Sequence, residues 1–405
     1  MASKLKVWID DRFPMTELWE NHVSKYYAPK NLNFWYLFGV FSLLVLLNQI
    51  ITGIWLAMYY TPTGAEAFDS VEQIMRNVKY GWLLRYMHST GASAFFAVIY
   101  LHMYRGIMYG SYKGPRELLW VIGMVILVVL LIEAVTGYVL PWGQMSFWAT
   151  KVLISVFSVI PFVGKYVITW LQGDYNVSGI TLHRFFSFHV VLLPLAIIAL
   201  TLVHVMALHK VGSNNPEGIE IKACKDSLGR PLDGIPFHPY YTLKDLVGVV
   251  IFLIVFFLIV FYAPTFGGYF IEAPNFVPAN PLVTPPVIVP PWYLASFYSI
   301  LRAVPNKLMG VIVAAAAVAF LFVLPWLDRS PVKSIRYRGV WSKLGLTVFV
   351  ISFAGLGVVG TMSLTPLVLF FSRFFTVTFF MVFLTMPFYT KHEHCKRVPD
   401  RVTKG

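Results

Sequence analysis

The sequence predicts an all-α membrane protein with eight transmembrane helices. Only 13% of the 405 residues are charged, whereas 58% are hydrophobic. Soluble domains carry about 25% charged residues, so this chain has too few charges to cover a surface that faces water. Its apolar residues also fall into long runs, and a helix needs about 20 such residues to cross a bilayer.

Eight apolar runs are predicted to be membrane-spanning helices: 34–60, 82–109, 116–139, 184–209, 242–262, 308–327, 341–361 and 366–389. Two long connections, 140–183 and 263–307, are not spans. The first is amphipathic and is broken by proline and glycine, and the second is rich in proline. Proline at this density does not form a helix that faces lipid. We therefore expect these connections to hold short amphipathic helices and functional loops.

The helices group into two bundles joined by a polar loop. The predicted segments are an N-terminal segment (1–33), a bundle of four helices (34–210), a loop (211–241), a C-terminal set of four helices (242–390, with the long loop 263–307) and a tail (391–405). Most of the 32 lysines and arginines lie at one membrane face. The positive-inside rule makes that face cytoplasmic, so both termini are predicted inside and both long connections outside.

The basic residues and the cysteines exclude other classes of protein. The net charge of +13 comes from residues between apolar runs, a pattern that reflects membrane topology and not nucleic-acid binding. Cys224 and Cys395 lack the spacing of a zinc site or a disulfide framework.

Four histidines form two matched layers in the first bundle. His88 and His102 are fourteen residues apart on one predicted helix, and His189 and His204 are fifteen apart on another. Fourteen residues at about 100° each return to nearly the same helix face roughly 21 Å further on. Because both helices cross in the same direction, His88 faces His189 and His102 faces His204. One buried histidine is as easily a structural residue, but four in two layers indicate two cofactor sites.

Haem fits these sites better than a bare metal ion does. Two histidines alone leave a transition metal under-coordinated, whereas haem supplies four nitrogens and needs only axial ligands. Two glycine pairs repeat the fourteen-residue period and give room for flat rings: Gly39 with Gly53, and Gly123 with Gly137. Arg85 and Arg105 lie three residues from His88 and His102, where they can neutralise haem propionates or anchor the helix at the membrane interface.

The chain resembles the cytochrome b family, the membrane core of quinol:cytochrome c oxidoreductases of the cytochrome bc1 type. The resemblance covers nearly the whole chain. Its strongest motifs are RYMHSTGAS (85–93), GYVLPWGQMSFWAT (137–150), HRFFSFH (183–189), FHPYYTLKD (237–245), PANPLVTPP (278–286) and LRAVPNKLMGV (301–311).

The resemblance implies two b haems and a Q cycle. His88 and His189 would bind the outer, low-potential haem, and His102 and His204 the inner, high-potential haem. Ubiquinol would be oxidised at an outer site and ubiquinone reduced at an inner site, so that a proton gradient forms. The implied partners are a Rieske iron–sulfur protein, cytochrome c1, a second copy of the complex and membrane lipid, in the inner membrane of a proteobacterium.

The sequence departs from the family pattern at two points. Respiratory members usually space the second histidine pair by fourteen residues, not fifteen, and Pro194 lies between His189 and His204. The outer site usually reads PEWY, and its glutamate takes a proton from quinol. Here the motif reads Pro290-Pro291-Trp292-Tyr293, so that glutamate is missing.

The resemblance places quinol oxidation at the outer ends of the bundles. The residues assigned to this outer quinone site are Tyr138, Pro141, Trp142, Gly143, Pro291, Trp292 and Tyr293. Glu133, one turn before Tyr138, is our candidate for the missing proton acceptor, because a carboxylate at that depth is costly unless it is used or paired. A structural hydrogen bond to a neighbouring helix is the alternative.

The inner quinone site is predicted between two helix ends. His209 ends the fourth helix and Asp245 begins the fifth, so a histidine and a carboxylate flank the expected quinone. Lys244 is positioned to hold the quinone ring or a lipid phosphate. For Asp245 the alternative is a favourable charge at a helix N-terminus.

Two other functions fit a polytopic helical chain. A transporter with a proton relay would also carry intramembrane His, Glu and Arg, and a haem-bearing membrane anchor of a dehydrogenase would also hold bis-histidine haem. The first does not explain the fourteen-residue repeats. The second is usually shorter and lacks the proline-rich outer loop.

Overall fold

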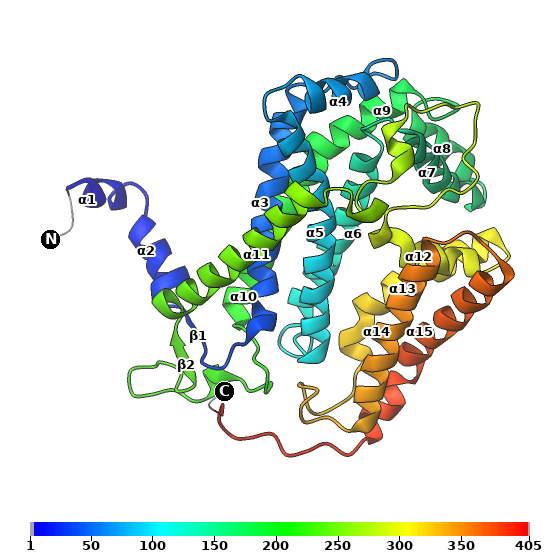
Figure 1. Ribbon diagram of the computed structural model, residues 1–405. Helices are drawn as coiled ribbons and strands as arrows, with labels where there is room; N and C mark the ends of the chain where they lie inside the picture. The colour runs from blue at the N-terminus through cyan, green and yellow to red at the C-terminus, as the bar shows by residue number, and fades with distance from the viewer. Residues whose placement is uncertain (1–3, 404–405) are drawn as a thin grey trace.

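The computed structural model describes residues 4–403, and the chain is mostly helical (Figure 1). The first part contains α1 (Lys4–Asp10), α2 (Met15–Trp19), α3 (Leu37–Ala57), α4 (Ala67–Arg76), α5 (Gly81–Met108) and α6 (Glu117–Tyr138). The middle contains α7 (Gln144–Ser155), α8 (Gly164–Gln172), α9 (Gly179–Ser187), α10 (Leu193–Val211) and α11 (Thr242–Tyr262). The last part contains α12 (Trp292–Ala303), α13 (Lys307–Leu327), α14 (Val340–Gly360) and α15 (Pro366–His392). The ends of the predicted N-terminal segment and tail, residues 1–3 and 404–405, lie outside the described residues.

Within residues 4–403, seven helical segments are long and apolar enough to cross a bilayer. They contain α3, α6, the continuous segment Gly179–Val211 with α9 and α10, α11, α13, α14 and α15. The predicted span at 82–109 forms α5, which has 28 residues. At about 1.5 Å per residue α5 is long enough to span a bilayer, but it is not among the seven. The count of eight spans therefore stays a prediction that depends on α5.

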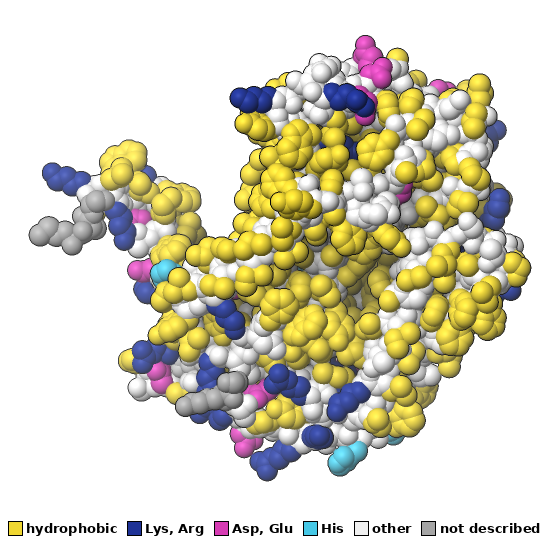
Figure 2. Space-filling model, viewed as in Figure 1, with side chains coloured by type: hydrophobic (Ala, Val, Ile, Leu, Met, Phe, Trp, Pro, Cys, Tyr) yellow, Lys and Arg dark blue, Asp and Glu magenta, His cyan; other side chains and the backbone are white. Residues whose placement is uncertain are grey.

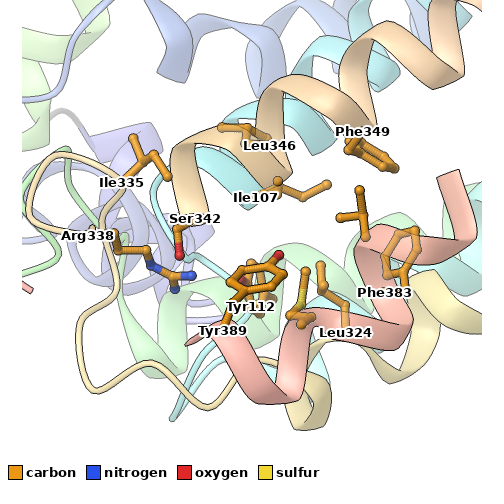
Figure 3. Close-up of a pocket in the computed structure, with 13 residues that line it drawn as sticks. Ile107, Tyr112, Leu324, Ile335, Arg338, Ser342, Leu346, Phe349, Phe383 and Tyr389 are labelled. Atoms are coloured by element: carbon orange, nitrogen blue, oxygen red, sulfur yellow. The ribbon is translucent and has the colours of Figure 1, made fainter. Parts of the chain in front are cut away.

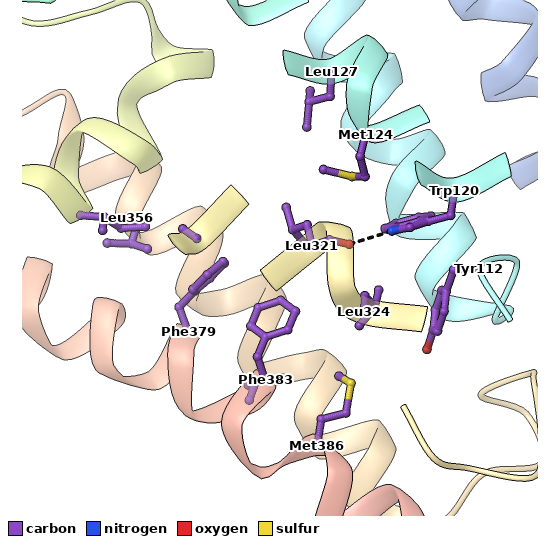
Figure 4. Packing of buried hydrophobic residues seen from close by; sticks show 13 residues of the cluster. Tyr112, Trp120, Met124, Leu127, Leu321, Leu324, Leu356, Phe379, Phe383 and Met386 are labelled. Carbon is purple, nitrogen blue, oxygen red and sulfur yellow. Dashed lines mark hydrogen bonds between the residues drawn. The ribbon is translucent and has the colours of Figure 1, made fainter. Parts of the chain in front are cut away.

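The helices pack as two bundles, and one of the hydrophobic clusters of the core lies between them. In the first bundle α3 packs along α5, and α6 packs along α10; in the second, α12 to α15 pack on one another. A core cluster joins α6 to α13, α14 and α15 (Figure 4). Within it, Trp120 Nε1 donates a hydrogen bond to the Leu321 carbonyl at 2.7 Å, which satisfies a polar group that would otherwise be buried without a partner.

The two long connections contain short helices. Those in 140–183 include α7 and α8, and α12 closes the loop 263–307. Together with α4 and α9, α7 and α8 gather at one end of the molecule, whereas the short sheet of β1 (Tyr27–Pro29) and β2 (Gly234–Pro236) and the C-terminus lie at the other (Figure 1). Exposed apolar side chains cover the surface between the two ends, and lysines and arginines gather beside the C-terminus (Figure 2).

One buried carboxylate ties three distant segments together at the end that holds the C-terminus. Asp233 accepts from Lys30 Nζ at 2.9 Å and from Arg401 Nε at 2.7 Å. The hydrogen bond from Arg401 is the largest of the effects that lower the pKa of Asp233 to about 2. The N-terminal segment, the loop 211–241 and the tail therefore lie on the same side of the bundles.

Candidate functional site

The four histidines meet in two pairs, as their spacing predicts. The rings of His88 on α5 and His189 are 6.2 Å apart, centre to centre, and inclined at 84°. Those of His102 on α5 and His204 on α10 are 6.5 Å apart and inclined at 61°. An imidazole nitrogen binds a metal ion at about 2 Å, so two rings that share one ion in line have centres roughly 6 Å apart. Both pairs therefore fit the two axial positions of a haem.

A hydrogen bond from the neighbouring helix fixes how His88 is oriented. The Thr52 hydroxyl on α3 donates to the Asn48 carbonyl at 2.6 Å, so it can only accept from His88 Nδ1, which is 2.9 Å away. With its proton on Nδ1, the ring keeps the lone pair of Nε2 for a metal. Sequence reasoning missed Thr52, although it directly precedes Gly53 in the chain.

Each glycine of the two predicted pairs faces one histidine of the pairs. A Cβ atom added to Gly39, Gly53, Gly123 or Gly137 would meet the ring of His102, His88, His204 or His189, respectively. The tightest case is Gly137, where the added atom would lie 2.2 Å from Cε1 of His189. The glycines thus give room to the imidazole rings themselves, which explains why they repeat the period of the histidines.

A π-helical turn accounts for the fifteen-residue spacing. Residues Phe188–Leu192 form a π turn between α9 and α10, and His189 lies within it. A π turn holds one residue more than an α turn, so the extra residue is absorbed locally. Pro194, at the start of α10, lacks the N–H that an unbroken α-helix would use. His204 consequently keeps its place opposite His102, and the inner pair is not disrupted.

The two arginines accompany the two histidine layers. Arg85 interacts electrostatically with His88. Arg105 lies 3.4 Å from Nδ1 of His102, and its guanidinium stacks 4.6 Å from the centre of the Tyr36 ring. A positive charge is thus available beside each pair to neutralise a haem propionate.

The structure gives Glu133 a histidine as its partner. Oε1 of Glu133 lies 3.1 Å from Nδ1 of His189, and the Glu133 carbonyl lies 3.0 Å from the same atom. The sequence predicts this carboxylate beside the outer quinone site as a proton acceptor. In the structure the carboxylate lies against a candidate haem ligand on the neighbouring helix, as in the alternative interpretation, and His189 Nδ1 donates its hydrogen bond to the Glu133 backbone carbonyl.

The outer-site motifs come together from distant parts of the chain. Residues 141–143 follow α6 and pair with the loop 263–307: the Ala279 N–H donates to the Trp142 carbonyl at 2.9 Å, and Gly143 forms an isolated bridge with Pro278. Pro291 is the buried residue that precedes α12.

The aromatic residues of the PPWY motif are anchored on α5. Trp292 Nε1 donates to the Ser93 hydroxyl at 3.1 Å, and Tyr293 stacks on Phe96 with ring centres 4.2 Å apart.

Two residues that sequence reasoning missed lie against Tyr138. Glu272 and Asn275 are in the loop 263–307, and the Tyr138 hydroxyl donates to Oε2 of Glu272 at 3.0 Å. Asn275 Nδ2 is within hydrogen-bonding distance of both groups. The sequence held a signal for Glu272, since it is the only acidic residue between Asp245 and Asp328.

The predicted inner-site residues lie on either side of the N-terminal segment. His209, near the end of α10, stacks on Tyr26 with ring centres 4.6 Å apart. Asp245 is in the first turn of α11 and is half-buried. The neighbouring Lys244 donates to the Leu32 carbonyl at 2.5 Å. Residues 26–32 therefore connect the two helix ends that the sequence assigned to quinone.

A small pocket in the second bundle lies apart from these sites (Figure 3). None of the predicted site residues lines it, and its walls are mostly apolar. Its one arginine, Arg338, is already paired with Asp328 at 2.6 Å. The pocket lies where Ile107 of α5 and Tyr112 pack against α13 to α15.

The helical membrane fold with two facing histidine pairs fits the class of membrane proteins that hold haem between histidines. Comparison with known families agrees: the models described as "Cytochrome b/b6/petB" and "Cytochrome b(C-terminal)/b6/petD" match residues 23–212 and 278–380. The chain belongs to the cytochrome b family, and membership implies that it binds haem b. The family favours neither the transporter nor the dehydrogenase anchor.

Similar proteins cover almost all of the chain. Cytochrome b of Allochromatium vinosum is 54% identical over 404 residues, which span 98% of this chain and 97% of that protein. Cytochrome b of Rhodospirillum rubrum is 48% identical, and the match spans 95% of this chain and 92% of that protein. The solved structure of a "Hyperthermophilic respiratory Complex III" matches with a TM-score of 0.87 and 38% identity, over 95% of this chain and 98% of that one.

Proposed function

We propose that this chain is the membrane subunit of a proteobacterial quinol:cytochrome c oxidoreductase. Its two histidine pairs hold two b haems, one above the other, and the haems supply an electron path between the membrane faces. The observation that carries this proposal is the pair of ring separations, 6.2 and 6.5 Å, each backed by glycines that leave space for the imidazoles.

The polar residues at the two ends handle protons and quinone. At the outer site, Tyr138 and Tyr293 face ubiquinol beside Trp142 and Pro291. At the inner site, His209 and Asp245 deliver the two protons that ubiquinone takes up when it is reduced, and Lys244 orients the quinone ring. Oxidation at one face and reduction at the other release protons outside and consume them inside, as a Q cycle requires.

Partner subunits supply the remaining redox centres. The chain has two cysteines and no CxxCH motif, so it has no cysteine set for an iron–sulfur cluster and no attachment motif for a c-type haem. A Rieske iron–sulfur protein and cytochrome c1 fill these roles. A relative from Bradyrhizobium diazoefficiens is named "Cytochrome b/c1", and the match spans 56% of that protein. The complex is a homodimer in the bacterial inner membrane, with both termini of this chain in the cytoplasm.

Haem content and spectrum test the proposal directly. The purified complex should yield two b haems for each copy of this chain, with two components in a reduced-minus-oxidised spectrum. Quinol should reduce both, and cytochrome c should reoxidise the complex. One haem per chain, or haems that quinol does not reduce, would contradict the proposal.

A further inference from the structure

The outer site lacks the carboxylate that its family pattern supplies, and the structure offers another. Pro291 is buried at the start of α12 and has no titratable group. The loop that leads to it contains one acidic residue, Glu272, which directly precedes the short 3-10 turn Ala273–Phe276. The inference drawn from this residue rests on the proposed quinol-oxidising function.

Three side chains form a closed hydrogen-bonded group around the carboxylate of Glu272. Oε2 of Glu272 accepts from the Tyr138 hydroxyl at 3.0 Å and from Asn275 Nδ2 at 2.9 Å. Asn275 Nδ2 also lies 3.1 Å from the Tyr138 oxygen. Both hydrogen bonds to Glu272 fall on Oε2 and neither uses Oε1, so the carboxylate can still accept a hydrogen bond from a quinol hydroxyl.

Asn275 also connects this hydrogen-bonded group to the Pro-Trp-Gly segment (141–143) of the outer site. Its Oδ1 accepts from the Ser146 N–H at 2.8 Å. A Cβ atom at Gly143 would lie 2.8 Å from the Asn275 backbone, so only glycine permits this close approach. Glu272 is therefore fixed against the loop 141–143 and is not on a free segment of chain.

The surroundings of Glu272 suit a proton acceptor that works near neutral pH. Burial raises the pKa of Glu272 to about 6, against the lowering effect of hydrogen bonds from its own backbone N–H, from Tyr138 and from Asn275. The titratable side chains that interact with it are Tyr138 from α6 and Tyr293 from α12. Neither is a cation, and among the described residues no lysine, arginine or histidine contributes to the pKa of this carboxylate. A general base is most effective when its pKa lies near the working pH.

We propose that Glu272 is the catalytic proton acceptor of the outer quinol site. The O–H bond of one quinol hydroxyl breaks as a new O–H bond forms on the Glu272 carboxylate. The O–H bond of the other hydroxyl breaks as its proton and one electron go to the iron–sulfur partner, and the second electron goes to the outer haem, so that quinone forms. The proton on Glu272 then passes to the outer aqueous phase. Tyr138 and Asn275 hold the carboxylate in place. Glu133 contacts a candidate haem ligand instead, since its Oε1 lies 3.1 Å from Nδ1 of His189.

The test replaces Glu272 in the whole complex and measures quinol oxidation against pH. Glu272→Gln keeps size and hydrogen bonding but cannot accept a proton, so the rate should fall about a hundredfold. The rise in rate as the pH passes through about 6 should also disappear. Glu272→Asp should keep part of the rate, and adding Pro291→Glu to Glu272→Gln should recover it. Glu66→Gln, an exposed carboxylate just before α4, is the matched control and should behave as the wild type.

A second measurement distinguishes failure of this inference from failure of the proposed function. It follows the reduction of the inner haem by quinol that enters through the inner site. This half-reaction and both haem spectra should be normal in Glu272→Gln. If Glu272→Gln keeps the wild-type rate and pH profile while the wild type oxidises quinol, the role of Glu272 is overturned and the function stands. If quinol reduces neither haem in the wild type, the proposed function fails and this inference fails with it.

Discussion

At the scale of single residues, two carboxylates near the outer end of the first bundle differ in the side chains that they contact. Glu133 contacts the ring of His189, and Glu272 contacts Tyr138. A carboxylate hydrogen-bonded to a ligating histidine orients the ring and increases its basicity as a ligand. In the role that we propose, Glu272 exchanges protons with quinol instead. Chemically similar groups therefore take different roles because of what each one touches.

Glu133→Gln tests the positioning role. The amide still accepts a hydrogen bond but is a weaker acceptor, so His189 becomes a less basic ligand. We expect both haems to remain, the midpoint potential of the outer haem to rise, and the pH profile of quinol oxidation to match the wild type. A redox titration and a pH series measure these quantities. An unchanged potential together with a roughly hundredfold slower, pH-shifted oxidation would return the role of proton acceptor to Glu133.

Asp245→Asn tests the inner site. Without a carboxylate to deliver a proton, reoxidation of the inner haem by quinone should slow about a hundredfold, as is typical when a placed acid or base is removed. The first turnover of outer quinol oxidation should be unaffected. Stopped-flow spectra of the b haems resolve the two steps. Asp400→Asn, in the exposed part of the tail, is the control. Equal slowing of both half-reactions by Asp245→Asn would assign this residue a structural role.

At the scale of elements, the helix that carries His189 and His204 shows how one extra residue is tolerated. The π turn Phe188–Leu192 takes up that residue beside the first ligand, and α10 continues as a regular helix to the second. Without the turn, His204 would be rotated by about 100° away from His102. π turns are frequent at functional sites for this reason.

Changing the length of this helix tests the function of the π turn. Deleting Val191, an exposed residue within the turn, should convert it to an α turn and leave two haems per chain. Inserting one leucine after the exposed Leu202 adds a residue that no existing turn absorbs, so the inner haem should be lost. Haem extraction and the reduced-minus-oxidised spectrum count the haems. Loss of the inner haem on deletion would show that the π turn itself is required.

At the scale of the whole molecule, charge and hydrogen bonding agree on which segments share a side. Asp233 joins Lys30 and Arg401, so the N-terminal segment, the loop 211–241 and the tail meet at one end. The helices α4, α7, α8 and α9 gather at the opposite end (Figure 1). The basic residues concentrate at the first of these ends (Figure 2), so the positive-inside rule predicts that this end faces the cytoplasm.

Reporter fusions test this orientation. A reporter that is active only outside the cytoplasm should be active when it is fused at Gly64, before α4, or at Ala279, in the loop before α12. The same reporter should be silent at Asn215, in the loop after α10. The reverse pattern would exchange the inner and outer sites and with them the direction of proton release.

The helices, the two histidine layers and the residues of the family motifs follow from the sequence alone. Helical period is a local property, so spacings of fourteen residues predict which side chains share a face without knowledge of the fold. Three kinds of contact depend on the folded structure: each glycine faces an imidazole, Glu133 contacts His189, and Glu272 meets Tyr138. The last contact joins residues 134 positions apart through a proline-rich loop. Such a loop has no helical or strand periodicity from which contacts could be predicted. Its course depends on hydrogen bonds to distant segments, such as those of Asn275 to Ser146 and Tyr138.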